Sequence, residues 1–289
     1  MLSLLAAAAS AGEPLYWLDL GLTRGIDLGF FMLRWYSLAY LAGIMLGYWL
    51  MLRMIRSAGA PLAQRHADDL FFYCTLGIIL GGRLGYATFY DRDLWAHPLE
   101  LLKLWNGGMS FHGGLIGTVV AIAWVTWRNK LQFLRVCDYI AAGGPAFGML
   151  FGRLANFVNG ELWGRVAGEG VSWAMVFPDG GPLPRHPSQL YQAGLEGALL
   201  AVVMLVLFWK TSARFRPGLL VGIFAAGIGA ARFFVEYFRE PDAQLSEFAE
   251  RSGLSMGQWL TLPLIAVGLF FAIRALRRPP LGSATPPSA

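Results

Sequence analysis

The chain has 289 residues, of which 56% are hydrophobic and only 14% are Asp, Glu, Lys or Arg. A typical soluble domain is about one-quarter charged, so this chain lacks the polar surface of a water-soluble fold, and its apolar content excludes an intrinsically disordered chain. The net charge of +5 comes from few charged residues and does not by itself indicate nucleic-acid binding. Composition therefore predicts an integral membrane protein.

Long apolar segments recur along the chain, and a helix needs roughly 20 such residues to cross a bilayer. Seven spans are predicted, at residues 29–52, 70–90, 109–127, 139–158, 190–209, 218–238 and 256–276. We therefore expect an all-α polytopic membrane protein with about seven transmembrane helices, forming a single transmembrane helical domain over residues 1–278.

The connections between the spans differ in character. Residues 91–108 include DLWAHPLELLKLW, whose spacing predicts an amphipathic helix in the membrane interface. Residues 159–188 form the longest outer connection and are rich in Gly, Pro and Trp, which predicts a small extracytoplasmic cap. Residues 279–289 are rich in Pro and Ser, and we expect a disordered cytoplasmic tail there.

The basic residues between the spans predict the orientation, because cytoplasmic loops are enriched in Lys and Arg. Twelve lie in one set of loops and seven are spread over the longer loops of the other set. The first set is therefore expected to be cytoplasmic. This places the N-terminus outside and the C-terminus in the cytoplasm.

Several ionisable residues fall within the predicted spans or at their mouths, where charge is costly and usually faces an interior, a cavity or a partner. They are Arg34, Arg83, His112, Arg153, Glu196, Arg232 and Glu236. With the predicted orientation, all seven lie in the outer half of the membrane and predict a polar cluster at one depth. Two alternatives stay open: each arginine extends to the outer headgroups, and Arg232 and Glu236, four residues apart, form a purely structural pair.

Arginine suits phosphate, because its planar guanidinium donates two parallel hydrogen bonds and stays charged. Several arginines at headgroup depth predict binding of an anionic phospholipid. His112, within SFHGGLIG, is a candidate general base, because histidine is the side chain that most often takes this role near neutral pH. A histidine at a helix start also has a structural interpretation.

Six motifs together resemble one family. They are GGRLGY (81–86), NGGMSFHGGLIG (106–117), GRLANFVNGELWGR (152–165), RHPSQLY (185–191), ARFFVEYFREPDAQ (231–244) and SMGQWLTLP (255–263). In this combination the chain resembles prolipoprotein diacylglyceryl transferase from about Trp35 to the last predicted helix.

The resemblance implies a multi-pass enzyme of the bacterial inner membrane with its active site at the outer, periplasmic leaflet. Such enzymes move the diacylglyceryl group of phosphatidylglycerol onto the thiol of the lipobox cysteine in a prolipoprotein signal peptide. A thioether forms and glycerol phosphate leaves, in the first step of lipoprotein maturation. The resemblance implies no metal or other cofactor. It implies membrane lipid and these two substrates as partners, and the acidic outer side argues against nucleic acid.

The resemblance also assigns roles to residues. It implies His112, Arg153 and Arg232 as catalytic, with Arg153 also binding the phospholipid, and Tyr36, Asn156, Glu161 and Gly164 as substrate-binding. The charged residues in or beside the spans add Arg83, Glu236 and Arg239 to the substrate-binding candidates, and Glu236 is expected to hold Arg232 in position. Either His112 or the field of the arginines is expected to generate the thiolate.

The main alternative from another class is a secondary transporter for an anionic solute. Such a protein would place polar groups near the midplane and on both sides of the membrane. The predicted polar groups lie on one side only, which counts against transport. Another phospholipid headgroup transferase is the nearest alternative among enzymes.

Overall fold

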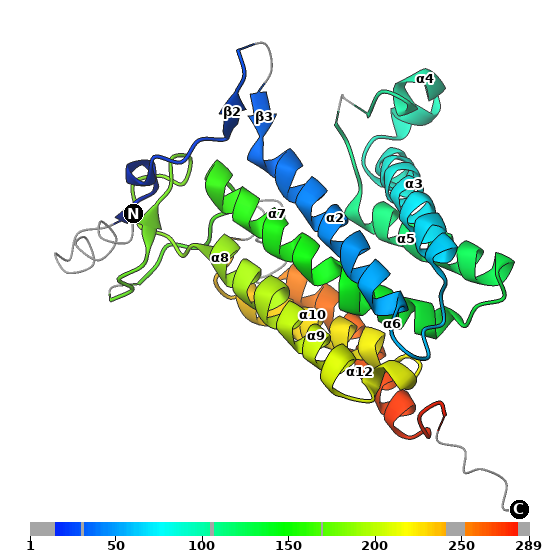
Figure 1. The fold of residues 1–289 in the computed structure, drawn as a ribbon. Helices are drawn as coiled ribbons and strands as arrows, with labels where there is room; N and C mark the ends of the chain where they lie inside the picture. Colours follow the sequence, from blue (N-terminus) through cyan, green and yellow to red (C-terminus); the bar gives the residue numbers. More distant parts are fainter. Residues whose placement is uncertain (1–14, 30–31, 105–106, 169, 241–251, 283–289) are drawn as a thin grey trace, which may run out of the picture. The chain divides into compact units, whose positions relative to one another are not determined.

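The computed structural model describes residues 15–29, 32–104, 107–168, 170–240 and 252–282, and over these the protein is mostly helical (Figure 1). The predicted disordered tail, 279–289, lies largely outside the described residues. The chain divides into two compact units. The first unit combines Met1–Gly47 with Ile140–Ala289, and the second unit is Tyr48–Tyr139.

Four helical stretches among the described residues are long and apolar enough to cross a membrane: Trp35–Ile55, Gln64–Phe89, Ser188–Lys210 and Met256–Leu276. A shorter apolar helix, α10, covers Leu219–Val235. Each of these five coincides with a predicted span.

The predicted span 139–158 is interrupted. Helix α6 (Phe133–Gly143) ends before Gly144, and α7 (Pro145–Asn159) begins at a proline. Proline lacks an N–H and its ring clashes with the preceding turn, so it is favoured in the first turn of a helix and disfavoured in the interior, although the helix Met256–Leu276 continues through Pro263. The sequence Gly-Gly-Pro therefore ends one helix and starts the next.

In the first unit, α7 packs against α8 (Ser188–Gln192) and against η4 (Ala193–Leu199), a π-helical stretch that continues into α9 (Leu200–Lys210). Helix α10 packs along α12 (Met256–Leu276) and also contacts α8, η4 and α9. A π-helical stretch within a helix frequently marks a functional site. Here it carries the buried carboxylate of Glu196.

The segment between α7 and α8 is folded against the start of the chain. Strand β4 (Met175–Val176) pairs in parallel with β1 (Leu15–Tyr16). Trp17 packs with Met175 and Phe177, and its indole N–H donates to the carbonyl of Phe157 at 2.8 Å. Strands β2 (Gly25–Asp27) and β3 (Met32–Arg34) form a separate antiparallel pair just before α2 (Trp35–Ile55).

In the second unit, α3 (Gln64–Phe89) packs along α5 (Phe111–Arg128). The two helices meet at glycines: a Cβ atom on Gly77 or Gly81 would run into the carbonyl oxygen of Gly117 or Gly113. The backbones can approach this closely only because these positions carry no side chain.

The described residues of this connection, 91–104 and 107–108, do not form the predicted amphipathic helix. They contain a 3₁₀ turn, η2 (Arg92–Trp95), and a single helical turn, α4 (Pro98–Leu101). Pro98 explains the break, because the residue before a proline is disfavoured in the helical conformation. His97 accordingly has φ −125° and ψ 71°.

Candidate active site

A chain of polar contacts runs across the end of α7. The guanidinium of Arg153 donates through Nη1 to Oδ1 of Asn156 at 3.4 Å, and Nδ2 of Asn156 donates to Oε1 of Glu161 at 2.8 Å. Asn156 is buried, whereas Arg153 is partly exposed and Glu161 is exposed. Asn156 therefore bridges a cation and a carboxylate, and it orients both.

Glycine at the end of α7 makes this contact possible. Gly160 has φ +71°, and its N–H donates to the carbonyl of Phe157 at 3.0 Å. A left-handed glycine is a common way to end a helix and turn the chain. The turn brings Glu161 back over Asn156, and Gln189 at the start of α8 fixes it by donating to the Glu161 carbonyl at 2.7 Å.

At the end of α10, the carboxylate of Glu236 pairs with two arginines, one that precedes it in the helix and one that follows it. Oε2 of Glu236 lies 3.8 Å from Nε of Arg232 and 3.8 Å from Nη1 of Arg239. The Glu236 side chain is only 7% exposed, and those of Arg232 and Arg239 are 26% and 18% exposed. Unpaired burial of a carboxylate is costly, so the two arginines and Glu236 stabilise one another.

The ends of α7 and α10 belong to one electrostatic group. Arg153 is repelled by Arg232 and Arg239. All three arginines are attracted to the buried carboxylate of Glu196 in η4. We call Arg153, Arg232 and Arg239 the arginine group. Tyr36, at the start of α2, interacts electrostatically with Arg153 and with Glu161. The first unit thus concentrates positive charge around a few buried acidic side chains.

The segment between α7 and α8 is hydrogen-bonded to the end of α10. The N–H of Arg165 donates to the carbonyl of Phe238 at 2.9 Å, and its Nε donates to the carbonyl of Arg239 at 2.9 Å. The residue before Arg165, Gly164, donates its N–H to the carbonyl of His186 at 2.9 Å. A Cβ on Gly164 would collide with the carbonyl oxygen of Phe238 and lie 2.7 Å from that of His186. Gly164 is therefore required for packing at the crossing of three backbone segments.

His112 and Arg83 belong to the second unit, and the other eight predicted site residues belong to the first. His112 is exposed on the first turn of α5, which is capped by the hydroxyl of Ser110 accepting from the Gly113 N–H at 3.2 Å. An exposed imidazole at a helix start is accessible to a substrate.

Arg83 is buried, and its guanidinium is surrounded by backbone carbonyls of residues 100–108. It donates to the carbonyls of Leu101 at 3.0 Å, Glu100 at 2.7 Å, Gly108 at 3.1 Å and Gly107. All three nitrogens are engaged, so Arg83 fixes the connection that leads into α5. This geometry favours a structural role for Arg83 over a role in binding phosphate.

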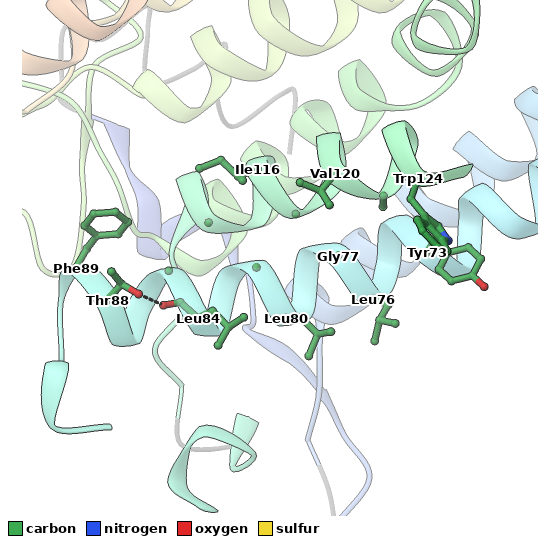
Figure 2. A pocket seen from close by; sticks show the side chains of 15 residues that line it. Tyr73, Leu76, Gly77, Leu80, Leu84, Thr88, Phe89, Ile116, Val120 and Trp124 are labelled. Atoms are coloured by element: carbon green, nitrogen blue, oxygen red, sulfur yellow. Dashed lines mark hydrogen bonds between the residues drawn. The ribbon is translucent and has the colours of Figure 1, made fainter. Parts of the chain in front are cut away.

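A groove of about 480 Å³ runs between α3 and α5 in the second unit (Figure 2). Apolar side chains such as Leu80 and Ile116 line it together with glycines, and the Thr88 hydroxyl donates to the carbonyl of Leu84 at 2.7 Å. The wall has no charged side chain, so it offers nothing to hold a phosphate.

Two polar residues in the site were not among the predicted site residues. The sequence marks Glu196 only as an ionisable residue within a predicted span. Its interaction with the arginine group depends on the packing of η4 against α7 and α10. Gln192, one turn earlier, donates to Oε1 of Glu196 at 3.3 Å. An acid in an apolar segment was the available signal, because such residues are rarely tolerated without a partner.

Taken together, helices that are long and apolar enough to cross a membrane and a partly buried arginine group define a helical membrane protein with clustered positive charge. Comparison with known proteins narrows this class. The family model for prolipoprotein diacylglyceryl transferase matches residues 25–274. The chain belongs to this family.

Three similar proteins are each named phosphatidylglycerol–prolipoprotein diacylglyceryl transferase. The protein from Erythrobacter litoralis (strain HTCC2594) is 59% identical over 283 residues, covering 98% of this chain and 99% of the relative. That from Zymomonas mobilis is 50% identical over 247 residues, covering 86% and 85%. That from Rhodopseudomonas palustris is 47% identical over 260 residues, covering 88% and 89%. These names support the transferase prediction and give no support to the transporter alternative.

Proposed function

We propose that this protein transfers the sn-1,2-diacylglyceryl group of phosphatidylglycerol to the thiol of the lipobox cysteine in a prolipoprotein. The observation that carries the proposal is the arginine group with its buried carboxylates, in a chain that belongs to the transferase family. The reaction takes place at the outer leaflet of the bacterial inner membrane, in a protein of seven spans with its N-terminus outside and the 159–188 connection as an extracytoplasmic cap.

The thiolate sulfur attacks the glyceryl CH2 carbon that carries the phosphate ester. A carbon–sulfur bond forms and the carbon–oxygen bond to phosphate breaks, so glycerol phosphate leaves with the bonding electron pair. Negative charge grows on the departing phosphate. Arg153 and Arg232 bind this phosphate and offset the growing charge. Hydrogen-bond donors that are already in position where charge develops usually make the largest single contribution to transition-state stabilisation.

The remaining residues of the first unit position these two arginines and the substrates. Glu236 holds Arg232 and Arg239 through its two ion pairs. Asn156 hydrogen-bonds the headgroup while it holds Arg153, and Tyr36 contributes to the same headgroup site. Glu161, exposed at the end of α7, receives the peptide together with the segment that follows it.

The thiol must lose its proton, since a free cysteine with a pKa of about 8.5 is mostly protonated at neutral pH. His112 takes this proton as general base. The positive field of the arginine group is the second route, because a nearby cation lowers the pKa of a thiol. Replacing His112 with glutamine separates the two: substantial activity of that variant would remove histidine as an obligatory base.

The proposed reaction is tested with purified protein in detergent, phosphatidylglycerol and a lipobox peptide. We expect glycerol phosphate release in equal amount to peptide whose cysteine has gained one diacylglyceryl mass. A peptide with serine in place of the cysteine is the control and should accept nothing. A folded protein that forms neither product would overturn the proposal.

A further inference from the structure

The carboxylate of Glu236 lies on the first turn of α12, against Gly257. A Cβ atom on Gly257 would lie 2.6 Å from Oε1 and 3.0 Å from Oε2 of Glu236. Such distances are too short for real contacts, so the carboxylate occupies the space that any side chain at 257 would need. Glycine at this position is what lets the carboxylate reach the helix.

This end of α12 is built to hold its orientation. The Ser255 hydroxyl accepts from the N–H of Gln258 at 3.1 Å, and the Gln258 side chain accepts from the N–H of Ser255 at 3.0 Å. This reciprocal pair is a capping box, which fixes the start of a helix. Nε2 of Gln258 also donates to the carbonyl of Phe233 at 3.2 Å, which joins the first turn of α12 to α10.

The electrostatics favour a carboxylate at this place. The first turn of a helix carries free N–H groups and a partial positive charge, which stabilises an anion. Glu236 is 6% exposed, and its Oε2 accepts no hydrogen bond from the residues that the structure describes. Its compensation comes from Arg232 and Arg239 on one side and from the start of α12 on the other.

We propose that Gly257 is a positioning residue for diacylglyceryl transfer. Together with the first turn of α12 it forms a seat for the Glu236 carboxylate, and through Glu236 it sets the direction of Arg232 and Arg239. The inference rests on the proposed function in one respect, namely that these arginines bind the substrate phosphate. The seat itself is a contact between α12 and α10 in the free protein.

Gly257→Ala forces the carboxylate to move. The added methyl group cannot yield, because it is fixed to the helix backbone, whereas the Glu236 side chain can rotate. Alanine has a better helix propensity than glycine, so the helix itself is not weakened. Displacing a positioning group by about 1 Å can cost about 100-fold in rate, and we expect kcat/KM for phosphatidylglycerol to fall about 10- to 100-fold.

A second substitution tests whether the loss acts through Glu236. Glu236→Asp shortens the side chain by one methylene and withdraws the carboxylate from position 257. In the Glu236→Asp background, Gly257→Ala should therefore cost much less than in the wild type. The matched control is Gly148→Ala in the N-terminal part of α7, since a Cβ there meets nothing within 4 Å, and it should leave kcat/KM unchanged.

The four proteins of this cycle are compared by kcat, by KM for phosphatidylglycerol and by melting temperature. Contacting residues give non-additive effects, so the seat predicts coupling in both kcat/KM and melting temperature. Equal losses from Gly257→Ala in the two backgrounds, or no loss at all, would overturn it. If the wild type does not transfer the diacylglyceryl group from phosphatidylglycerol, the proposed function fails. The seat is tested separately by melting temperature, and it is overturned if the shifts caused by Gly257→Ala and Glu236→Asp simply add in the double variant.

Discussion

Asn156 is the residue on which the geometry at the end of α7 depends. It accepts from Arg153 and donates to Glu161, and it is buried between them. Hydrogen bonds to charged groups contribute about 1.5–3 kcal/mol each. An uncharged amide that contacts both a cation and an anion is difficult to replace, because no smaller side chain both accepts and donates at that distance.

We predict that Asn156→Ala lowers kcat/KM for phosphatidylglycerol about 10- to 100-fold, in keeping with the loss of about 1.5–3 kcal/mol. Arg153 and Glu161 would both lose their orientation. Asn159→Ala is the matched control: it removes only the second hydrogen bond to Glu161, at 3.2 Å, and leaves Arg153 unaffected. Steady-state kinetics of the two variants checks this, and equal losses would contradict the bridging role.

The residue types in the arginine group could be predicted from the sequence, but their partners could be predicted only in part. The spacing of Arg153 and Asn156, three apart, and of Arg232 and Glu236, four apart, places each pair on one helix face. The electrostatic interaction of Glu196 with this group joins different helices, and no local pattern encodes it. The partners of Arg83 could not be predicted either. They are backbone carbonyls, and their positions depend on how the connection before α5 folds.

At the scale of elements, the connection between α7 and α8 is held to the end of α10 by backbone hydrogen bonds around Gly164 and Arg165. These bonds place Arg239 beside Glu236. The connection therefore contributes to the arginine group through backbone hydrogen bonds.

Gly164→Ala should separate these segments, because its methyl group overlaps the carbonyl of Phe238. Overpacking of this kind costs about 1–3 kcal/mol, and we expect at least about a 10-fold drop in activity with faster tryptic cleavage at Arg165. Gly168→Ala, in the same connection, meets nothing within 4 Å and should behave as wild type. If both variants had the same activity and cleavage rate, the packing role would be wrong.

The elements themselves were predicted well where long apolar runs decide them. Four helices and the shorter α10 lie within or close to the predicted spans. The differences occur at prolines: Pro145 separates α6 from α7, and Pro98 breaks the helix predicted over 91–108. Composition averaged over a window detects apolar length, whereas the helix boundaries at Pro145 and Pro98 depend on single residues, and α12 continues through Pro263 all the same.

At the scale of the whole molecule, the orientation rests on the distribution of Lys and Arg between the loops. Ser172 lies exposed in the connection between α7 and α8, and Ser212 lies exposed between α9 and α10. The predicted topology places these two serines on opposite sides of the membrane.

Cysteines introduced at these two positions test the orientation. The background is a variant with Cys74 and Cys137 replaced by serine, which also serves as the unlabelled control. In spheroplasts, a membrane-impermeant maleimide should label Ser172→Cys at once and Ser212→Cys only after the membrane is permeabilised. The opposite pattern would invert the topology and place the arginine group on the cytoplasmic side.

The central claim is that the arginine group binds the phosphate of phosphatidylglycerol while the diacylglyceryl group is transferred. The most direct measurement is kcat/KM for transfer to a lipobox peptide in wild type, Arg153→Ala and Arg24→Ala, with folding verified by melting temperature. Loss of one preset donor to a developing anion costs about 100- to 1,000-fold, so we predict that loss for Arg153→Ala and wild-type rates for Arg24→Ala, whose side chain is 67% exposed. Folded Arg153→Ala with wild-type kcat/KM would contradict the account.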